Sequence, residues 1–135
     1  MRFMMLMIPK GYEDAAPGIA PKAEDVEAMM RYNEALKEAG VLLALDGLHP
    51  PSMGARVSFR GGKPEVAEGP FPGVAETLGG FWMIQAGSKE EAVEWAKRCP
   101  AAETDVIEVR QVFELSDFPE DVQKAAGKAM GGGQA

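Results

Sequence analysis

The order of the expected secondary-structure elements predicts an α+β fold, with one sheet and two helices on the same face. Two observations support this. Short apolar strands alternate with helical segments in the order strand, helix, strand, then a hairpin, then strand, helix, strand. The chain has 135 residues, of which 46% are hydrophobic and 26% charged, as expected for one globular domain.

The first strand–helix–strand unit spans residues 3–48. Residues 3–8 are an apolar run stopped by Pro9, and residues 9–21 are rich in proline and glycine and form a loop. A helix is expected over residues 22–39, ended by Gly40, and a strand over residues 41–48. The apolar positions that recur at helical spacing are Val26, Met29, Met30 and Leu36.

A hairpin is expected next. Residues 55–60 alternate strictly between apolar and polar, and Gly61-Gly62 is a two-residue turn signal. The returning strand, residues 64–67, begins with proline and therefore belongs at an edge. A loop follows from Glu68, and one helical turn is expected before Leu78.

The second unit begins with a strand over residues 81–86. Ser88 and Glu91 have the spacing of a capping box and open a helix that Pro100 ends. The last long strand is expected over residues 106–113. Asp117 with Glu120 indicates the cap of a short C-terminal helix, and residues 130–135 are expected to be a flexible tail.

This βαββαβ order with an inserted hairpin is the ferredoxin-like arrangement, because right-handed crossovers place both helices on one face of the sheet. The expected strands 3–8 and 81–84 are apolar on both faces, so the face without helices would leave a large apolar surface in water. The sequence therefore predicts a homodimer whose two sheets pack face to face.

Composition excludes several classes of function. Lys and Arg total 14 against 21 Asp and Glu, and this acidic balance disfavours nucleic acid as a partner. The single cysteine excludes a disulfide framework and is typical of a cytoplasmic protein. We expect no metal and no cofactor, because metal-ligand spacings and glycine-rich nucleotide motifs are both missing. No apolar run is long enough to cross a membrane.

Several segments, in this order, resemble the YCII-related family, in its branch named after a DGPF motif. The matching segments are MRFMMLMI, Tyr32-Asn33-Glu34, Ala39-Gly40-Val41-Leu42-Leu43, Gly47-Leu48-His49-Pro50, Glu68-Gly69-Pro70-Phe71, Gly79-Gly80-Phe81-Trp82, Glu91-Ala92-Val93-Glu94-Trp95-Ala96 and Glu108-Val109-Arg110. The resemblance covers a domain over residues 1–115, and residues 116–135 add the short helix and tail.

The resemblance implies a dimeric α+β barrel of ferredoxin-like subunits. Members of the family are mostly of unknown function. Some look like lyases that act on lactones, and others accompany sigma-factor genes. This chain departs from the family at two points. Glu68 stands where the motif has aspartate, and the histidine suggested as catalytic in the first helix of the YCII branch has no counterpart here.

A candidate site follows from the topology. The first two strands run in the same direction and end at one edge of the sheet, where the strand from Gly80 begins. The loop 9–21, His49 and the segment 68–79 should therefore meet there. His49 is the candidate base and Glu68 the carboxylate that orients it or acts as the acid, because Asp46 faces the other side of an extended strand. The residues expected to bind the ligand are Tyr12, Asp46, Arg56, Phe71 and Trp82.

Each of these residues also has a purely structural interpretation. His49 could simply end a strand before Pro50, Glu68 could accept backbone amides in its loop, and Trp82 could belong to the core. Two functions therefore stay open at this point. One is a cofactor-free lyase or isomerase acting on a small, anionic metabolite. The other is a non-catalytic accessory or regulatory protein that uses the same cavity or the acidic surface.

Overall fold

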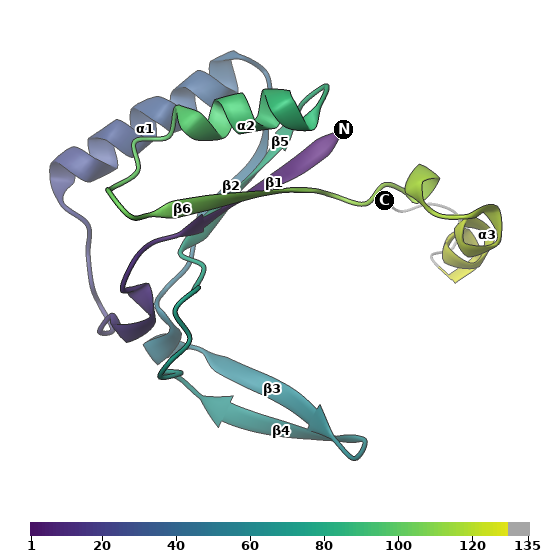
Figure 1. Ribbon diagram of the computed structural model, residues 1–135, viewed down its shortest axis with the longest axis horizontal. Helices are drawn as coiled ribbons and strands as arrows, with labels where there is room; N and C mark the ends of the chain where they lie inside the picture. The colour runs from purple at the N-terminus through teal and green to yellow at the C-terminus, as the bar shows by residue number, and fades with distance from the viewer. Residues whose placement is uncertain (130–135) are drawn as a thin grey trace.

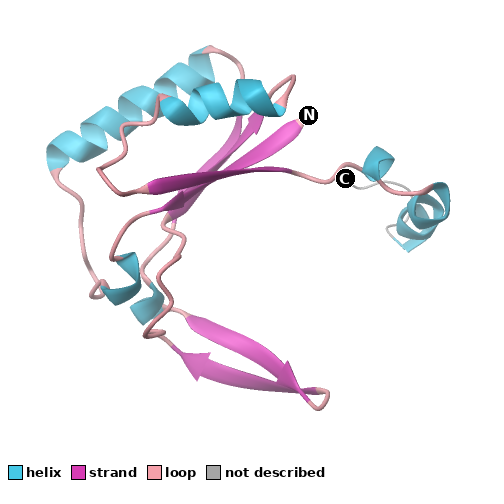
Figure 2. Cartoon of the chain, in the orientation of Figure 1, coloured by secondary structure: helices cyan, strands magenta, loops and turns pink. Residues whose placement is uncertain are grey.

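The computed structural model describes residues 1–129 and has two layers, a four-stranded sheet and two helices that cover one of its faces (Figures 1 and 2). Every neighbouring pair in the sheet is antiparallel, in the order β2-β5-β1-β6. The strands are β1 (Arg2–Ile8), β2 (Leu42–Gly47), β5 (Gly80–Gln85) and β6 (Val106–Gln111), and the covering helices are α1 (Ala23–Glu38) and α2 (Lys89–Lys97).

A separate hairpin and a C-terminal segment project from this body (Figure 1). The hairpin consists of β3 (Ala55–Arg60) and β4 (Lys63–Glu68), and the C-terminal helix is α3 (Glu120–Ala129). Three short 3-10 turns complete the chain: η1 (Tyr12–Asp14), η2 (Pro51–Met53) and η3 (Leu115–Asp117). The α+β class is therefore confirmed. The flexible tail expected at residues 130–135 lies outside the described residues.

Local sequence signals explain most element boundaries. Gly61 and Gly62 have φ angles of 59° and 79°, which is the left-handed backbone that a two-residue hairpin turn requires. The hydroxyl of Ser88 accepts a hydrogen bond from the Glu91 amide at 3.1 Å, so the expected cap of α2 is confirmed. The Glu91 carboxylate accepts from the amide of Gly87 at 2.9 Å, one residue earlier than in a standard capping box.

Two expectations about local structure are wrong. The inner face of α1 is rotated, so Val26 and Met30 are 43% and 61% exposed while Tyr32 and Leu36 are buried. The spacing of apolar residues alone does not decide whether Met30 or Tyr32 faces the core, since a tyrosine buries as much area as a methionine. The helical turn expected before Leu78 is missing, because Gly73 adopts a φ of 86° and breaks any helix there.

The core lies between the sheet and the two helices. Its largest fully buried side chains are Phe3, Met5, Leu36 and Ile84. Tyr32 and Trp82 join it as a T-shaped aromatic pair with ring centroids 5.5 Å apart, and the Tyr32 hydroxyl donates to the carbonyl of Trp95 at 2.7 Å. Burial raises the pKa of Tyr32, so its phenol stays protonated in this setting.

The other face of the sheet is apolar and has no helix over it. The register pairs Met4 with Met83 and Leu6 with Phe81, and all four side chains are half-buried. They alternate with the core residues of the same strands, so they project from the face opposite α1 and α2. From the sequence, we expect this open face to be covered by a second copy of the chain.

Candidate functional site

The three segments expected at one end of the sheet do meet there. The hydroxyl of Tyr12 donates to the carbonyl of Leu48, which ties η1 to the end of β2. The amide of Gly79 donates to the carbonyl of Met7 at 2.8 Å, and the Gly79 carbonyl accepts from the Leu48 amide at 2.9 Å. The loop after β1, the end of β2 and the entry to β5 are thus held together by one side-chain and two main-chain hydrogen bonds.

Close backbone packing at this end explains two glycines. A Cβ atom on Gly79 would lie 2.7 Å from Cγ of Pro9, so only glycine lets the chain pass this loop without displacing it. A Cβ on Gly69 would lie 1.7 Å from the carbonyl oxygen of Pro51. Gly69 also donates to the carbonyl of Gly54 at 2.8 Å, and the base of the hairpin is therefore pressed onto η2.

Two adjoining cavities lie at this end of the sheet and share the side chain of Met7 and the backbone of Gly79. The first, of about 200 Å³, lies between α1 and the ends of β2 and β5, and the second, of about 300 Å³, lies under the 9–21 loop. Asn33, Asp46 and Trp82 are in the wall of the first and Tyr12 in the wall of the second. The combined space suits a small metabolite rather than a nucleotide.

Asn33 and Trp82 form the best-defined polar contact in the first cavity. The indole Nε1–H of Trp82 donates to Oδ1 of Asn33 at 2.7 Å, and Trp82 is only 5% exposed. An indole can only donate, so the amide must turn its oxygen toward Trp82. The amide NH₂ of Asn33 is then left without a hydrogen-bond partner among the described residues, and it can donate to a ligand.

Asp46 is the one charged residue in the walls of the two cavities. Its side chain is exposed and makes no hydrogen bond or ion pair with the side chains described within residues 1–127. The register pairs Gly47 with Gly80 beside it, so no side chain fills the end of this strand pair. Asp46 itself pairs with Phe81, whose side chain lies on the open face of the sheet, whereas Trp82 and Asn33 lie on the helix side. The strand register therefore directs the Asp46 carboxylate to the opposite face from the Asn33 amide.

The second cavity borders a polar turn. Partial burial raises the pKa of Tyr12, so its hydroxyl stays a donor at neutral pH. The next residue, Glu13, has its Oε1 oxygen shielded from solvent and without a hydrogen-bond partner in the described part of the chain. A shielded acceptor of this kind is unusual and marks η1 as a place where a polar ligand group can bind.

His49 and Glu68 lie near this end but not in the cavity walls. Both are exposed, and the structure shows no hydrogen bond or ion pair between them. The strand β2 also ends at Gly47, one residue earlier than expected, so His49 lies two residues beyond the end of the strand. A direct bond between imidazole and carboxylate is therefore not present, and a contact through one water stays a prediction.

Arg56 and Phe71 are brought together by the base of the hairpin. The Arg56 guanidinium carbon lies 4.7 Å from the centroid of the Phe71 ring, a cation–π distance. Neither side chain reaches the two cavities. Of the five expected ligand-binding residues, the structure thus places Tyr12, Asp46 and Trp82 in the cavity walls.

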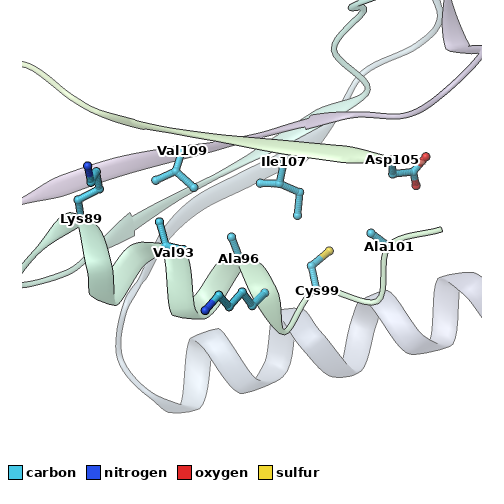
Figure 3. A pocket seen from close by; sticks show the side chains of 9 residues that line it. Lys89, Val93, Ala96, Cys99, Ala101, Asp105, Ile107 and Val109 are labelled. Atoms are coloured by element: carbon cyan, nitrogen blue, oxygen red, sulfur yellow. The ribbon is translucent and has the colours of Figure 1, made fainter. Parts of the chain in front are cut away.

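A larger groove of about 580 Å³ runs between α2 and β6, along the side edge of the sheet. Figure 3 shows Val93 and Ala96 of the helix facing Ile107 and Val109 of the strand. Cys99 lies in its floor, and burial raises the pKa of this thiol to about 11. The groove is open, its lining includes Lys89, Lys97 and Asp105, and it contains none of the expected site residues.

Reasoning from the sequence missed Asn33 and Glu13. Both are common surface residue types, and their importance depends on contacts with Trp82 and with the fold of η1. The one available signal for Asn33 was its position in a helix, one turn before the buried Leu36. A polar residue on the inner side of an amphipathic helix requires a partner.

The fold and site together define a two-layer α+β domain with a small, mixed polar and aromatic cavity at one end of its sheet. The chain belongs to the family of YCII-related domains, whose family model matches residues 1–116. It is also similar to an uncharacterised protein of Rhizobium meliloti (strain 1021). The two are 32% identical over 90 residues, which cover 64% of this chain and 73% of that protein.

Proposed function

We propose that this protein binds a small, uncharged metabolite that carries hydroxyl and carbonyl groups, in the two adjoining cavities at the end of the sheet. One observation carries the proposal: the amide NH₂ of Asn33 has no partner among the described residues and lies in a cavity whose wall is Trp82. A ligand carbonyl can accept from Asn33, a ligand hydroxyl can bind at η1, where the Glu13 Oε1 oxygen has no partner in the described part of the chain, and an apolar ring can pack on the indole.

The charge of the site argues against the anionic ligand that the sequence suggested. That expectation depended on Arg56, which stacks on Phe71 outside both cavities. The described walls of the two cavities contain no lysine or arginine that could bind an anion. Cyclic hydroxyketones have both groups without a charge, whereas lactones supply the carbonyl alone and small diols the hydroxyls alone.

A cofactor-free lyase or isomerase is the second candidate function. The observation that favours it is the unpartnered amide NH₂ of Asn33, which can stabilise a developing oxyanion in the cavity. His49 stays the candidate base, although its side chain is exposed and outside the cavity walls. If a ligand binds but exchanges no proton with the solvent, the protein has an accessory role without turnover.

We extend the proposal to the assembly. The strand order β2-β5-β1-β6 with both helices on one face supports a ferredoxin-like subunit, and the apolar open face supports a dimeric α+β barrel. The segment Glu68-Gly69-Pro70-Phe71 supports membership of the DGPF branch, with glutamate in place of aspartate. No helix within residues 1–129 is long and apolar enough to cross a membrane, and the single cysteine favours a cytoplasmic location.

A thermal-shift screen tests the binding site. The probes are five- and six-membered lactones, cyclic hydroxyketones and vicinal diols, with the ring-opened hydroxy acids as anionic controls. A ligand at 100 times its dissociation constant stabilises the folded state by about 2.7 kcal/mol, which raises the melting temperature by several degrees. Wild type and His49→Ala should respond alike, and Asn33→Asp should respond weakly.

Two outcomes contradict the proposal. In the first, no uncharged probe stabilises the wild type, or the hydroxy acids stabilise it more. In the second, Asn33→Asp keeps the full response. Deuterium exchange into a bound probe, followed by proton NMR, then separates the enzyme from the binding protein.

A further inference from the structure

The hairpin formed by β3 and β4 has one apolar face and one polar face. The register sets Val57 opposite Val66 and Phe59 opposite Pro64 on one face, with Arg56, Ser58 and Arg60 on the other. Every residue of both strands is exposed, and Phe59 is 77% exposed. Figure 1 shows the hairpin standing away from the sheet, on the side opposite the helices.

Such an element is not stable by itself. An isolated two-stranded hairpin is marginal in water and needs a third strand or a packing surface to keep its structure. No side chain described within residues 1–127 covers the apolar face. That face nevertheless carries Val57, Phe59 and Val66, which indicates that it is buried in the assembled protein.

The C-terminal arm, residues 113–129, also exposes apolar side chains, and it lies at the other end of the strands. Its aromatic side chains Phe113 and Phe118 stack with ring centroids 4.9 Å apart, and Phe113 is 70% exposed. The arm starts beside the beginning of β1, where Arg2 pairs with Glu114 at 2.7 Å. The hairpin leaves from the region where β1 and β2 end, so the two projections lie at opposite ends of the sheet.

We propose that the apolar face of the hairpin docks on the C-terminal arm of a second copy of this chain. The inference rests on the homodimer in the proposed function and adds the contact that completes it. When two sheets pack face to face about a twofold axis perpendicular to the strands, each end of one sheet lies over the opposite end of the other. This symmetry brings each hairpin to the partner's arm.

The area of the open sheet face supports the additional contact. Four strands of about six residues cover roughly 400 Å² of flat sheet, from the usual strand spacing and rise. A stable interface buries about 800 Å² on each partner. The outline of the sheet face is small beside that area. The exposed apolar side chains of the hairpin and the arm can add to it: Val57, Phe59, Val66, Phe113 and Leu115.

The net charges of the hairpin and the C-terminal arm favour one contact between the two copies over the others. The hairpin, residues 55–68, carries three basic and two acidic residues, and the arm carries four acidic and two basic ones. Hairpin against hairpin would oppose Arg56, Arg60 and Lys63 to their own copies. Hairpin against arm joins opposite net charges around an apolar centre, as is typical of specific interfaces.

Sedimentation equilibrium of a matched set of variants tests the proposal. Val57→Thr with Val66→Thr keeps the β-branched shape and strand propensity but places hydroxyls on the apolar face. The dimer should dissociate at least about tenfold more readily, since each buried hydroxyl lacks a partner. Ala67→Thr, which adds the same side chain to the polar face, should leave the dissociation constant unchanged. Circular dichroism of each variant confirms that the body is folded.

Cross-linking identifies the partner surface. Two preparations of different mass, Phe59→Cys and Leu115→Cys, both with Cys99→Ala, are mixed, equilibrated and treated with a short bismaleimide. The expected product joins one chain of each kind. Products joining only Phe59→Cys chains, or no product from a dimeric mixture, overturn the inference.

The results separate the inference from the proposed dimer. A wild type that is monomeric at micromolar concentration refutes both. A dimeric wild type with an unchanged dissociation constant in the double threonine variant refutes the hairpin contact and keeps the sheet-to-sheet dimer.

Discussion

Replacement of Asn33 by leucine tests the polar contact on which the candidate site depends. The Trp82 indole is 5% exposed, and its N–H donates to Asn33 at 2.7 Å. Leucine is similar in volume, so little packing is lost, but the buried N–H loses its only acceptor. Leaving a buried donor unsatisfied costs about 1–3 kcal/mol, which is a large part of the stability of one domain.

Urea unfolding of a double-mutant cycle measures that cost. The four proteins are wild type, Asn33→Leu, Trp82→Phe and the double variant. Trp82→Phe removes the donor, so Asn33→Leu should cost little in that background, and the coupling free energy should be about 1–2 kcal/mol. Asn33→Asp, which keeps an acceptor at the same place, is the matched control and should retain most of the stability.

The reasoning fails if Asn33→Leu lowers the free energy of unfolding by the same amount in both backgrounds. That result would mean that the indole and amide are not bonded in solution. The amide orientation, and with it the free NH₂ that faces a ligand, would then have no support.

Three further predictions concern the body of the domain. Leu36→Ala should lower the free energy of unfolding by about 2–5 kcal/mol because Leu36 is fully buried, whereas exposed Met30→Ala should change it by less than about 0.5 kcal/mol in chemical denaturation. The hydrogen bond from Arg2 lowers the pKa of Glu114, so this pair stabilises the fold above the unfolded pKa of about 4.3 and stops doing so as the pH falls through the lower folded value. Glu114→Gln should therefore melt below wild type at about pH 6 and close to it at about pH 2. Burial raises the pKa of Cys99 to about 11, and iodoacetamide at about pH 8 should alkylate it far more slowly in the folded than in the unfolded chain, as mass spectrometry would show.

The sequence predicted those parts of the fold that short-range chemistry determines. Gly61-Gly62 demanded a tight hairpin turn, and Ser88 with Glu91 marked the start of α2, because these signals act within a few residues. The inner face of α1 was partly wrong because Val26, Met30 and Tyr32 are all compatible with a core. Only the packing against Trp82 selects Tyr32.

The site was harder to predict for a related reason. Topology placed the right segments together, and Tyr12, Asp46 and Trp82 line the resulting cavities. Residue type drew attention to His49, since histidine is the usual base, whereas Asn33 gains its role from one hydrogen bond between distant elements. Such a bond has no signature in a single sequence.

Proton–nitrogen NMR of the two tryptophan indoles tests the central claim most directly. The chain contains two tryptophans, and Trp82 lines the cavity while Trp95 lies on α2 away from it. Titration with the lactone, hydroxyketone and diol probes should shift the Trp82 indole signal in a saturable way and leave that of Trp95 in place. If no probe moves the Trp82 signal, or if the Trp95 signal responds instead, the cavity at the end of the sheet is not the binding site.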